Sequence, residues 1–309
     1  MKFLGLLIRN RRAGTLAGLF LLGALLSFLT PSNLLNVKEQ TTINAVIAVG
    51  MTFVILSAGI DLSVGSIVAI SGVVLANRLQ SGAPLPVAIL CGLGVGALCG
   101  LVSGILITKG KLPPFISTLG MMSVARGAAL VFTDGRPISG FDESFRSLSI
   151  GRVLGIPAPV ILTILLYAAA SVLLNRTRFG RYVYAIGGNE EATRLSGVDT
   201  GFHKTVVYIL SGITAGLAAV LLTARLNSAQ PIAGAMYELD AIAAVVIGGT
   251  SLTGGLGTLS GTLIGALTMG VLRNGLNLLG ISSFLQQIVI GFVIIVAVLT
   301  DTLVKSKRR

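Results

Sequence analysis

The sequence predicts an all-α membrane protein whose helices cross the bilayer many times. Hydrophobic residues make up 53% of the 309 positions and charged residues only 11%, whereas a soluble domain carries roughly 25% charged residues. Apolar runs such as residues 87–108 and 284–300 approach the roughly 20 residues that a helical span needs. They lack the alternation of side chains that is typical of barrel strands. Because hydrocarbon offers the backbone no hydrogen-bond partners, helices are the expected structure.

Ten apolar segments follow one another along the chain and form a single expected domain, residues 1–309. Their expected bounds are residues 14–30, 43–59, 61–78, 85–107, 114–133, 158–174, 205–225, 239–251, 255–273 and 283–301. Near residues 58–62 and 238–256 the joins are so short that re-entrant or broken helices would produce the same pattern. Residues 27–31 make a poor signal-peptide cleavage site, so the first segment is expected to remain as a span.

Basic residues indicate the orientation, because cytoplasmic loops are enriched in Lys and Arg. With the N-terminus inside, fifteen of the 23 basic residues lie in cytoplasmic segments, seven lie outside, and Arg126 lies within a span. Both termini are therefore expected in the cytoplasm, as an even number of spans requires. The formal charge of +12 follows from this topology, and the chain has no basic domain with interleaved aromatic residues. Binding to nucleic acid is not expected.

The residues needed for most catalytic sites are scarce. His203 is the only histidine, and Cys91 and Cys99 are the only cysteines. One histidine and two cysteines are too few to favour a His-based metal site or a Ser-His-Asp triad. No segment fits the phosphate-binding loop, since Gly110-Lys111 is followed by leucine. We expect no cofactor or metal in this chain, and any ATP that drives it must bind to another chain.

Glycines at four-residue spacing in two of the segments suggest an internal repeat. They are Gly96, Gly100 and Gly104 in the first and Gly257, Gly261 and Gly265 in the second. Such stripes let neighbouring helices approach closely. Asp61 and Asp240 begin the segments that precede these two. The two glycine stripes lie five spans apart, and so do the two acids. An odd offset predicts two halves of opposite orientation, as in many transporters; the alternative is a chance match, because the chain contains 40 glycines.

Polar residues within the apolar segments are candidates for a hydrated path across the membrane. A neutral, hydroxyl-rich cargo would need hydrogen-bonding groups of this kind. The candidates are Asn44, Thr52, Ser57, Asp61, Ser63, Ser66, Asp240, Asn274 and Asn277. Each has a structural alternative, since hydroxyl groups also bond to helix carbonyls and a carboxylate is stabilised at a helix N-terminus. Arg126 and Glu238 are further ionisable residues in or near spans.

The longest predicted cytoplasmic segment, residues 175–204, contains a short capped helix. Asn189 suits its N-cap, Glu190 and Arg194 have the spacing of an i,i+4 ion pair, and Gly197 suits its end. A helix of about seven residues is unstable alone in water, so it must dock. Its partner could be this protein's own helices, the lipid surface or a cytoplasmic subunit.

Residues 187–197 read Gly-Gly-Asn-Glu-Glu-Ala-Thr-Arg-Leu-Ser-Gly. This motif resembles the membrane-spanning permease subunits of bacterial ABC importers for monosaccharides. Residues 49–66, 237–255 and 261–280 are similar to the same family, and the resemblance runs from about residue 30 to residue 303. It implies that the motif couples the permease to an ATP-binding subunit. The coupling residues would be Gly187, Gly188, Asn189, Glu190, Ala192, Arg194, Leu195, Ser196 and Gly197.

The resemblance implies a transport subunit rather than an enzyme. Its cargo would be a monosaccharide, with ribose the first candidate, and it would lie in the bacterial inner membrane. Its partners would be a cytoplasmic ATP-binding subunit holding ATP and Mg²⁺, a periplasmic sugar-binding protein, the lipid bilayer and a second permease protomer, most simply an identical copy. An ATP-independent sugar channel or secondary transporter is the alternative. A membrane enzyme is a third class, and the chain lacks a convergent catalytic cluster for it.

Overall fold

Helices make up most of residues 31–306, which are the residues that the computed structural model describes. The helices are α3 (Pro31–Leu56), α4 (Val64–Gln80), α5 (Leu85–Thr108), α6 (Pro114–Thr133), α7 (Glu143–Ile150), α8 (Ala158–Arg176), α9 (Arg178–Gly188), α10 (Glu190–Leu195), α11 (Thr200–Leu226), α12 (Tyr237–Ile247), α13 (Leu259–Leu278) and α14 (Ser283–Ser306). Two short antiparallel pairs join β1 (Ile138–Ser139) to β4 (Ser228–Ala229) and β2 (Arg152–Val153) to β3 (Ile156–Pro157). The predicted span at residues 14–30 and both chain ends lie outside the described residues.

Every predicted span from residue 43 onward corresponds to a helix, and α6 has the predicted bounds. Four helices, α5, α6, α8 and α11, are long and apolar enough to cross a membrane. Shorter apolar helices cover Thr41–Leu56, Val64–Gln80 and Ser283–Leu299. The prediction of an all-α, multi-pass membrane protein is therefore confirmed. The number of spans and the side on which each terminus lies stay predictions.

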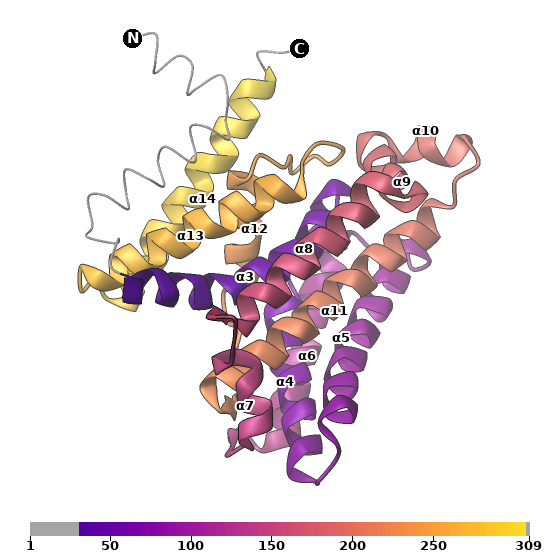
Figure 1. Cartoon of the computed structure of the whole chain (residues 1–309). Helices are drawn as coiled ribbons and strands as arrows, with labels where there is room; N and C mark the ends of the chain where they lie inside the picture. Colours follow the sequence, from indigo (N-terminus) through magenta and orange to yellow (C-terminus); the bar gives the residue numbers. More distant parts are fainter. Residues whose placement is uncertain (1–30, 307–309) are drawn as a thin grey trace, which may run out of the picture.

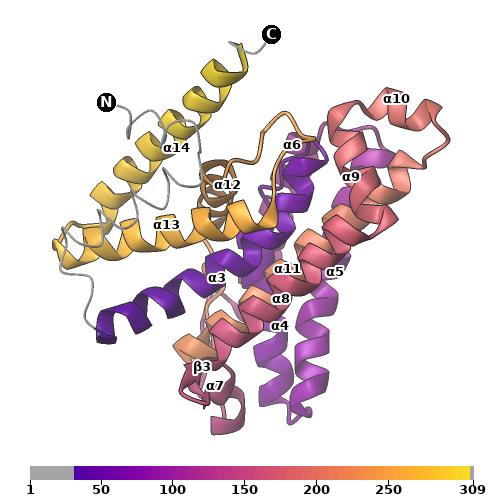
Figure 2. The same ribbon diagram turned by 45° about the horizontal axis from the view of Figure 1, so that its top comes forward.

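The helices form two groups that meet at α3. Figures 1 and 2 show α5, α8 and α11 running along one another, with α9 and α10 at one end of this group and α7 at the other. We refer to these as the α10 end and the α7 end. Helices α13 and α14 lie on the side of α3 away from α5, at an angle to the first group. Helix α3 packs against both groups, contacting α11 on one side and α13 on the other.

Glycine allows α5 and α11 to approach until their backbones touch. A Cβ atom on Gly96 would meet the carbonyl of Gly212, and one on Gly100 would meet the carbonyl of Tyr208. Gly94, on another face of α5, has open space beside it. The predicted glycine stripe on this helix is therefore confirmed as a helix contact of the kind that small residues permit in membranes.

The second predicted stripe is only partly right. Gly261 and Gly265 lie on α13, where they face Gly248, the C-cap of α12, and Ala244 within α12. Gly257 was expected on the same helix, but it precedes α13. The helix begins after it because Thr258 is the N-cap, whose hydroxyl accepts a hydrogen bond from the Gly261 amide at 3.1 Å.

Helices α4 and α12 both begin inside the molecule after non-helical segments. Residues 57–63 enter from the α10 end, where the amide of Gly255 donates to the carbonyl of Leu56 at 3.0 Å. Residues 227–236 enter from the α7 end, where the Asn227 side chain accepts from the amide of Phe141 at 3.0 Å. The broken-helix alternative therefore holds at residues 57–63, and the two interrupted connections enter from opposite ends.

Candidate functional site

Helix α10 lies at the tip of the α10 end (Figure 1), and its sequence sets both of its limits. Asn189 Oδ1 accepts a hydrogen bond from the amide of Ala192 at 2.9 Å. The Asn189 carbonyl accepts another from Thr193 Oγ1 at 2.7 Å. At the other end, Gly197 adopts a left-handed φ of +83°, which is costly for other residues. Both predicted caps are confirmed, and the helix between them is Glu190–Leu195.

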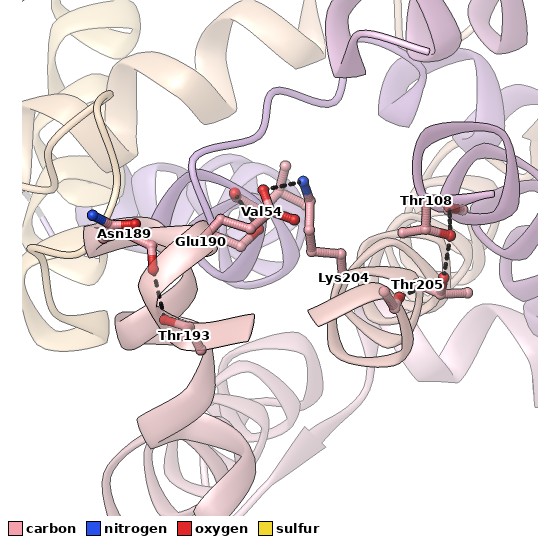
Figure 3. Close-up of polar contacts among 10 residues, drawn as sticks. Val54, Thr108, Asn189, Glu190, Thr193, Lys204 and Thr205 are labelled. Carbon is pink, nitrogen blue, oxygen red and sulfur yellow. Dashed lines mark hydrogen bonds and ion pairs between the residues drawn. The ribbon is translucent and has the colours of Figure 1, made fainter. Parts of the chain in front are cut away.

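The predicted ion pair between Glu190 and Arg194 is wrong. Arg194 Nη2 donates to Glu191 at 2.7 Å, and both side chains are 64% exposed. Glu190 instead accepts from Lys204 Nζ at 2.9 Å, and Figure 3 shows these two side chains pointing toward each other. The reason is that Glu190 faces α11, where the Lys204 side chain, only 14% exposed, supplies a cation. The hydrogen bond to Glu191 raises the pKa of Arg194 above its ordinary value, so Arg194 remains charged.

One contact connects α10 to the long helices, and a second joins two of those helices beside it. The Glu190–Lys204 pair joins it to the first turns of α11. Close by, the hydroxyls of Thr108 and Thr205 are 3.1 Å apart and join the end of α5 to α11 (Figure 3). A force on α10 would therefore reach α11 directly and α5 through α11.

The outward side of α10 is not covered by the described residues. Leu195 is 78% exposed, whereas Thr193 on the inner side is 8% exposed. Next to the helix, a cavity of about 520 Å³ opens between α10, the start of α11 and the α5–α6 connection. Lys111, Arg194 and Lys204 are among its lining residues, together with Glu190 and Asp199. This end of the protein therefore presents an apolar side chain beside a charged hollow.

Residues 175–204 contain a second helix, α9, which the sequence analysis missed. Its buried residues include Val183 and Ile186, and this helical spacing of apolar residues is the signal that could have revealed it. A Cβ atom on Gly187 would overlap the carbonyl of Leu56 and the amide of Gly255. Gly187 is thus required for packing α9 against α3, although it belongs to the predicted coupling motif.

Asp61 is fully engaged with other residues of this chain. Its Oδ1 accepts from the amide and the hydroxyl of Ser63 at 2.9 and 2.6 Å, and its Oδ2 accepts from Ser211 Oγ at 2.7 Å. Asp61 is 1% exposed and Ser63 is fully buried. In this conformation the carboxylate holds residues 57–63 against the middle of α11.

Other path candidates are also buried. Thr52 Oγ1 donates to the Ala48 carbonyl at 2.6 Å and lies 2.8 Å from Thr262 Oγ1. Ser57 Oγ donates to the Val54 carbonyl at 2.8 Å, and Ser66 is 2% exposed. Asn274 is 5% exposed, and its Oδ1 has no hydrogen-bond partner within residues 31–306.

Arg126 has a partner of a different kind. Its Nη1 donates to the carbonyls of Pro231 and Ala233 at 2.8 and 2.7 Å. The guanidinium therefore fastens the segment before α12 to α6.

Three path candidates come together around Asp240. Arg273 Nη2 lies 2.7 Å from both Asp240 oxygens, and Asn44 Nδ2 donates to Oδ2 at 3.3 Å. Nearby, Asn277 Oδ1 accepts from Gln286 Nε2 at 2.7 Å. Arg273 is one of the seven basic residues that the predicted topology places outside, and Gln286 was not a candidate. The missed signal was Asp240 itself, because an acid buried in a membrane protein needs a nearby counter-charge.

The chain was compared with known protein families. Residues 33–298 match the family described as branched-chain amino acid transport system / permease component. The chain belongs to this permease family. The match includes α10 and the Asp240 cluster, so both are parts of the family domain rather than additions to it.

Curated relatives resemble the chain over most of its length. The ribose import permease of Bacillus subtilis is 52% identical over 298 residues, which cover 94% of this chain and 92% of that protein. The ribose import permease of Escherichia coli K12 is 52% identical, with 89% and 87% covered. The D-allose transport permease of the same strain is 42% identical, with 90% and 86% covered. No solved structure matches the chain.

Proposed function

We propose that this chain is the membrane-spanning permease subunit of an ATP-driven importer for a monosaccharide, with ribose the first candidate. The observation that carries this proposal is α10, a capped helix whose outward side chains, including the 78% exposed Leu195, have no cover from the described residues. It coincides with the motif by which the chain resembles sugar permeases of ABC importers. Relatives 52% identical over 94% and 89% of the chain are named ribose import permeases.

In this proposal, α10 receives the movement of an ATP-binding subunit. ATP and Mg²⁺ bind to that subunit, which closes and pushes α10. The Glu190–Lys204 pair carries the push to α11, and the close packing of α11 on α5 moves the two helices together. Such a movement changes the populations of inward-open and outward-open states. The residues around α10 transmit force and carry out no covalent chemistry on the sugar.

The remaining parts of the proposal concern assembly and location. The permease lies in the bacterial inner membrane as one domain, residues 1–309, with its coupling segment at residues 175–204 in the cytoplasm. It spans the bilayer ten times, and both termini are cytoplasmic. A periplasmic sugar-binding protein delivers the cargo, and a second copy of the permease completes the path. The support for this orientation is the distribution of basic residues over the whole sequence, with fifteen of 23 in the predicted cytoplasmic segments and seven outside.

We infer that the ten spans form two inverted halves of five. The support comes from the two buried acids rather than from the glycine stripes. Asp61, before α4, contacts Ser211 of α11, whereas Asp240, at the start of α12, contacts Asn44 of α3. In each case the acid of one half bonds to the second span of the other half. An experimental structure in which residues 43–133 and 205–301 do not superpose would remove this inference.

A co-purification experiment tests the coupling proposal. The chain is extracted from its native membranes in mild detergent, and the proteins that accompany it are identified by mass spectrometry. We expect an ATPase with a phosphate-binding loop, which Leu195→Asp should release because a charge replaces an exposed apolar contact. Leu154→Asp is the matched control, since Leu154 is 98% exposed but follows β2, away from α10. Recovery of the folded permease alone, even after cross-linking, would favour an ATP-independent channel or secondary transporter.

A further inference from the structure

A second cavity, of about 340 Å³, lies where the start of α12, the end of α13 and the start of α14 meet. In Figures 1 and 2, α13 and α14 lie on the side of α3 opposite α5. The polar lining of the cavity includes Tyr237, Asp240, Arg273, Asn277, Gln286 and Gln287. Its volume is at the small end of the range for ligand pockets, which suits a ligand of one ring rather than a chain of several.

The charged pair in this cavity leaves hydrogen-bonding capacity unused. Asp240 is 2% exposed and Arg273 is 31% exposed. Both bonds between them use Arg273 Nη2, so they leave the hydrogens of Nη1 free. Because the two charges compensate each other, the cavity is neutral. An anion entering it would meet Asp240, and a cation would meet Arg273, so neither is favoured.

The amide side chains supply both donors and acceptors. Gln286 Nε2 donates to Asn277 Oδ1 at 2.7 Å and to the Ile281 carbonyl at 2.8 Å. These two bonds use both Gln286 amide hydrogens and leave its oxygen as an acceptor, while Asn277 keeps its amide hydrogens as donors. Gln287 is exposed beside them. The same helix carries exposed Phe284, Ile288 and Phe292. The amides therefore lie beside an apolar surface, which offers them no hydrogen bonds.

We propose that this cavity binds one monosaccharide as it crosses the membrane, an inference that rests on the proposed function. Each sugar hydroxyl both donates and accepts a hydrogen bond, which matches the mixture of amide, carboxylate and guanidinium groups. A sugar carries no net charge, in agreement with the neutral cavity. The half-buried Tyr237 adds an aromatic ring, against which the apolar C–H groups of a sugar can lie.

The test uses saturation-transfer NMR on the permease together with its ATP-binding subunit in lipid nanodiscs, with ribose as the probe. Asn277→Ala and Gln287→Ala each remove an amide that lines the cavity. Each variant should weaken ribose binding by about five- to tenfold, as expected for the loss of one hydrogen bond. Gln230→Ala is the matched control, because Gln230 is an exposed amide that does not line this cavity. All variants must elute as a single species with the ATP-binding subunit.

ATP-dependent uptake of labelled ribose by the native complex and its binding protein is measured in parallel. Uptake without saturation transfer to the native permease would overturn the sugar site and leave the proposed function standing. Equal binding in the native protein and both cavity variants would overturn the site as well. Binding that is weakened only by the cavity variants, without ATP-dependent uptake, would support the site and contradict the proposed function.

Discussion

Asp61 and Asp240 are both buried acids, yet their neighbours give them different roles. Asp61 accepts hydrogen bonds from serine hydroxyls and a backbone amide, is 1% exposed, and does not line the cavity beside Asp240. Asp240 pairs with Arg273 and lines the cavity at the start of α12. A buried charge that loses its partner is costly, because the low-dielectric surroundings no longer compensate it. The two acids should therefore respond differently to substitution.

The first prediction concerns the Asp240–Arg273 pair. Asp240→Ala should lower the free energy of unfolding by roughly 3–5 kcal/mol, because it strands the Arg273 guanidinium in a mostly buried position. The double variant Asp240→Ala, Arg273→Ala should lose less stability than the sum of the two single variants. Thermal unfolding of the four proteins in nanodiscs forms the double-mutant cycle. Strictly additive losses would show that the two side chains do not interact.

At the scale of elements, backbone contact and surface contact stabilise different parts of the molecule. The α5–α11 contact depends on the absence of side chains, since Gly96 and Gly212 face each other's carbonyls. Helix α10 depends on its caps and on one ion pair to α11, which is worth less than a fully buried pair because Glu190 is 47% exposed to water. Substitution at the first contact should affect folding, and substitution at the second should affect coupling.

The second prediction compares two glycines of α5. Gly96→Ala should destabilise the permease by roughly 1–3 kcal/mol, because the new methyl group overlaps the Gly212 backbone and forces the helices apart. Gly94→Ala should change stability by less than about 0.5 kcal/mol, since open space lies beside it. Thermal unfolding of the two variants measures the difference. Equal melting temperatures would contradict the close approach of α5 and α11.

The third prediction concerns the link between α10 and α11. Glu190→Ala should reduce the free energy of unfolding by less than Asp240→Ala does, because Glu190 is 47% exposed and the ammonium of Lys204, on its flexible stem, can turn toward water. It should nevertheless weaken the coupling between ATP hydrolysis and transport by roughly 0.5–2 kcal/mol, a range typical of residues that transmit a conformational change. The measurement is the number of sugars imported per ATP hydrolysed in proteoliposomes. Lys109→Ala serves as the control, because Lys109 is an exposed charged residue at the α10 end. An unchanged ratio of sugars imported to ATP hydrolysed in Glu190→Ala would refute the transmission role.

For the whole molecule, the arrangement of ends makes the orientation testable. Helices α5 and α8 end where α10 and the start of α11 lie, whereas α7 and the β-strand pairs lie around the other ends of the long helices. If the chain crosses the membrane as proposed, the α10 end and the α7 end face opposite compartments.

The fourth prediction uses this separation. In a background with Cys91→Ser and Cys99→Ser, Ser196→Cys should react with a membrane-impermeant maleimide only after the inner membrane is opened. Leu154→Cys should react in intact spheroplasts. Both positions are exposed in the fold. The cells lack the ATP-binding subunit, which is proposed to cover α10, so access depends on the compartment. The reverse pattern would place α10 outside the cell and contradict its role in binding a cytoplasmic subunit.

Much of the secondary structure followed from local properties of the chain. Long apolar runs, interrupted in α6 only by Arg126, were sufficient for α5, α6 and α8, because a helix pairs the backbone groups that hydrocarbon cannot. The caps of α10 were also local, since Asn189 and Gly197 act on amides and dihedral angles within a few residues. The family followed from the motif at residues 187–197, although the partner and cargo it implies are proposals.

Only the tertiary structure decided which side chains meet across the fold. Glu190 pairs with Lys204 rather than Arg194, and Asp240 pairs with Arg273, because helices distant in sequence bring these charges together. Hydropathy and spacing describe one segment at a time, whereas ion pairs and cavities depend on the relative positions of several. For that reason the sequence by itself determined the class of protein and most of its helices, and the packing of those helices determined the candidate sugar site.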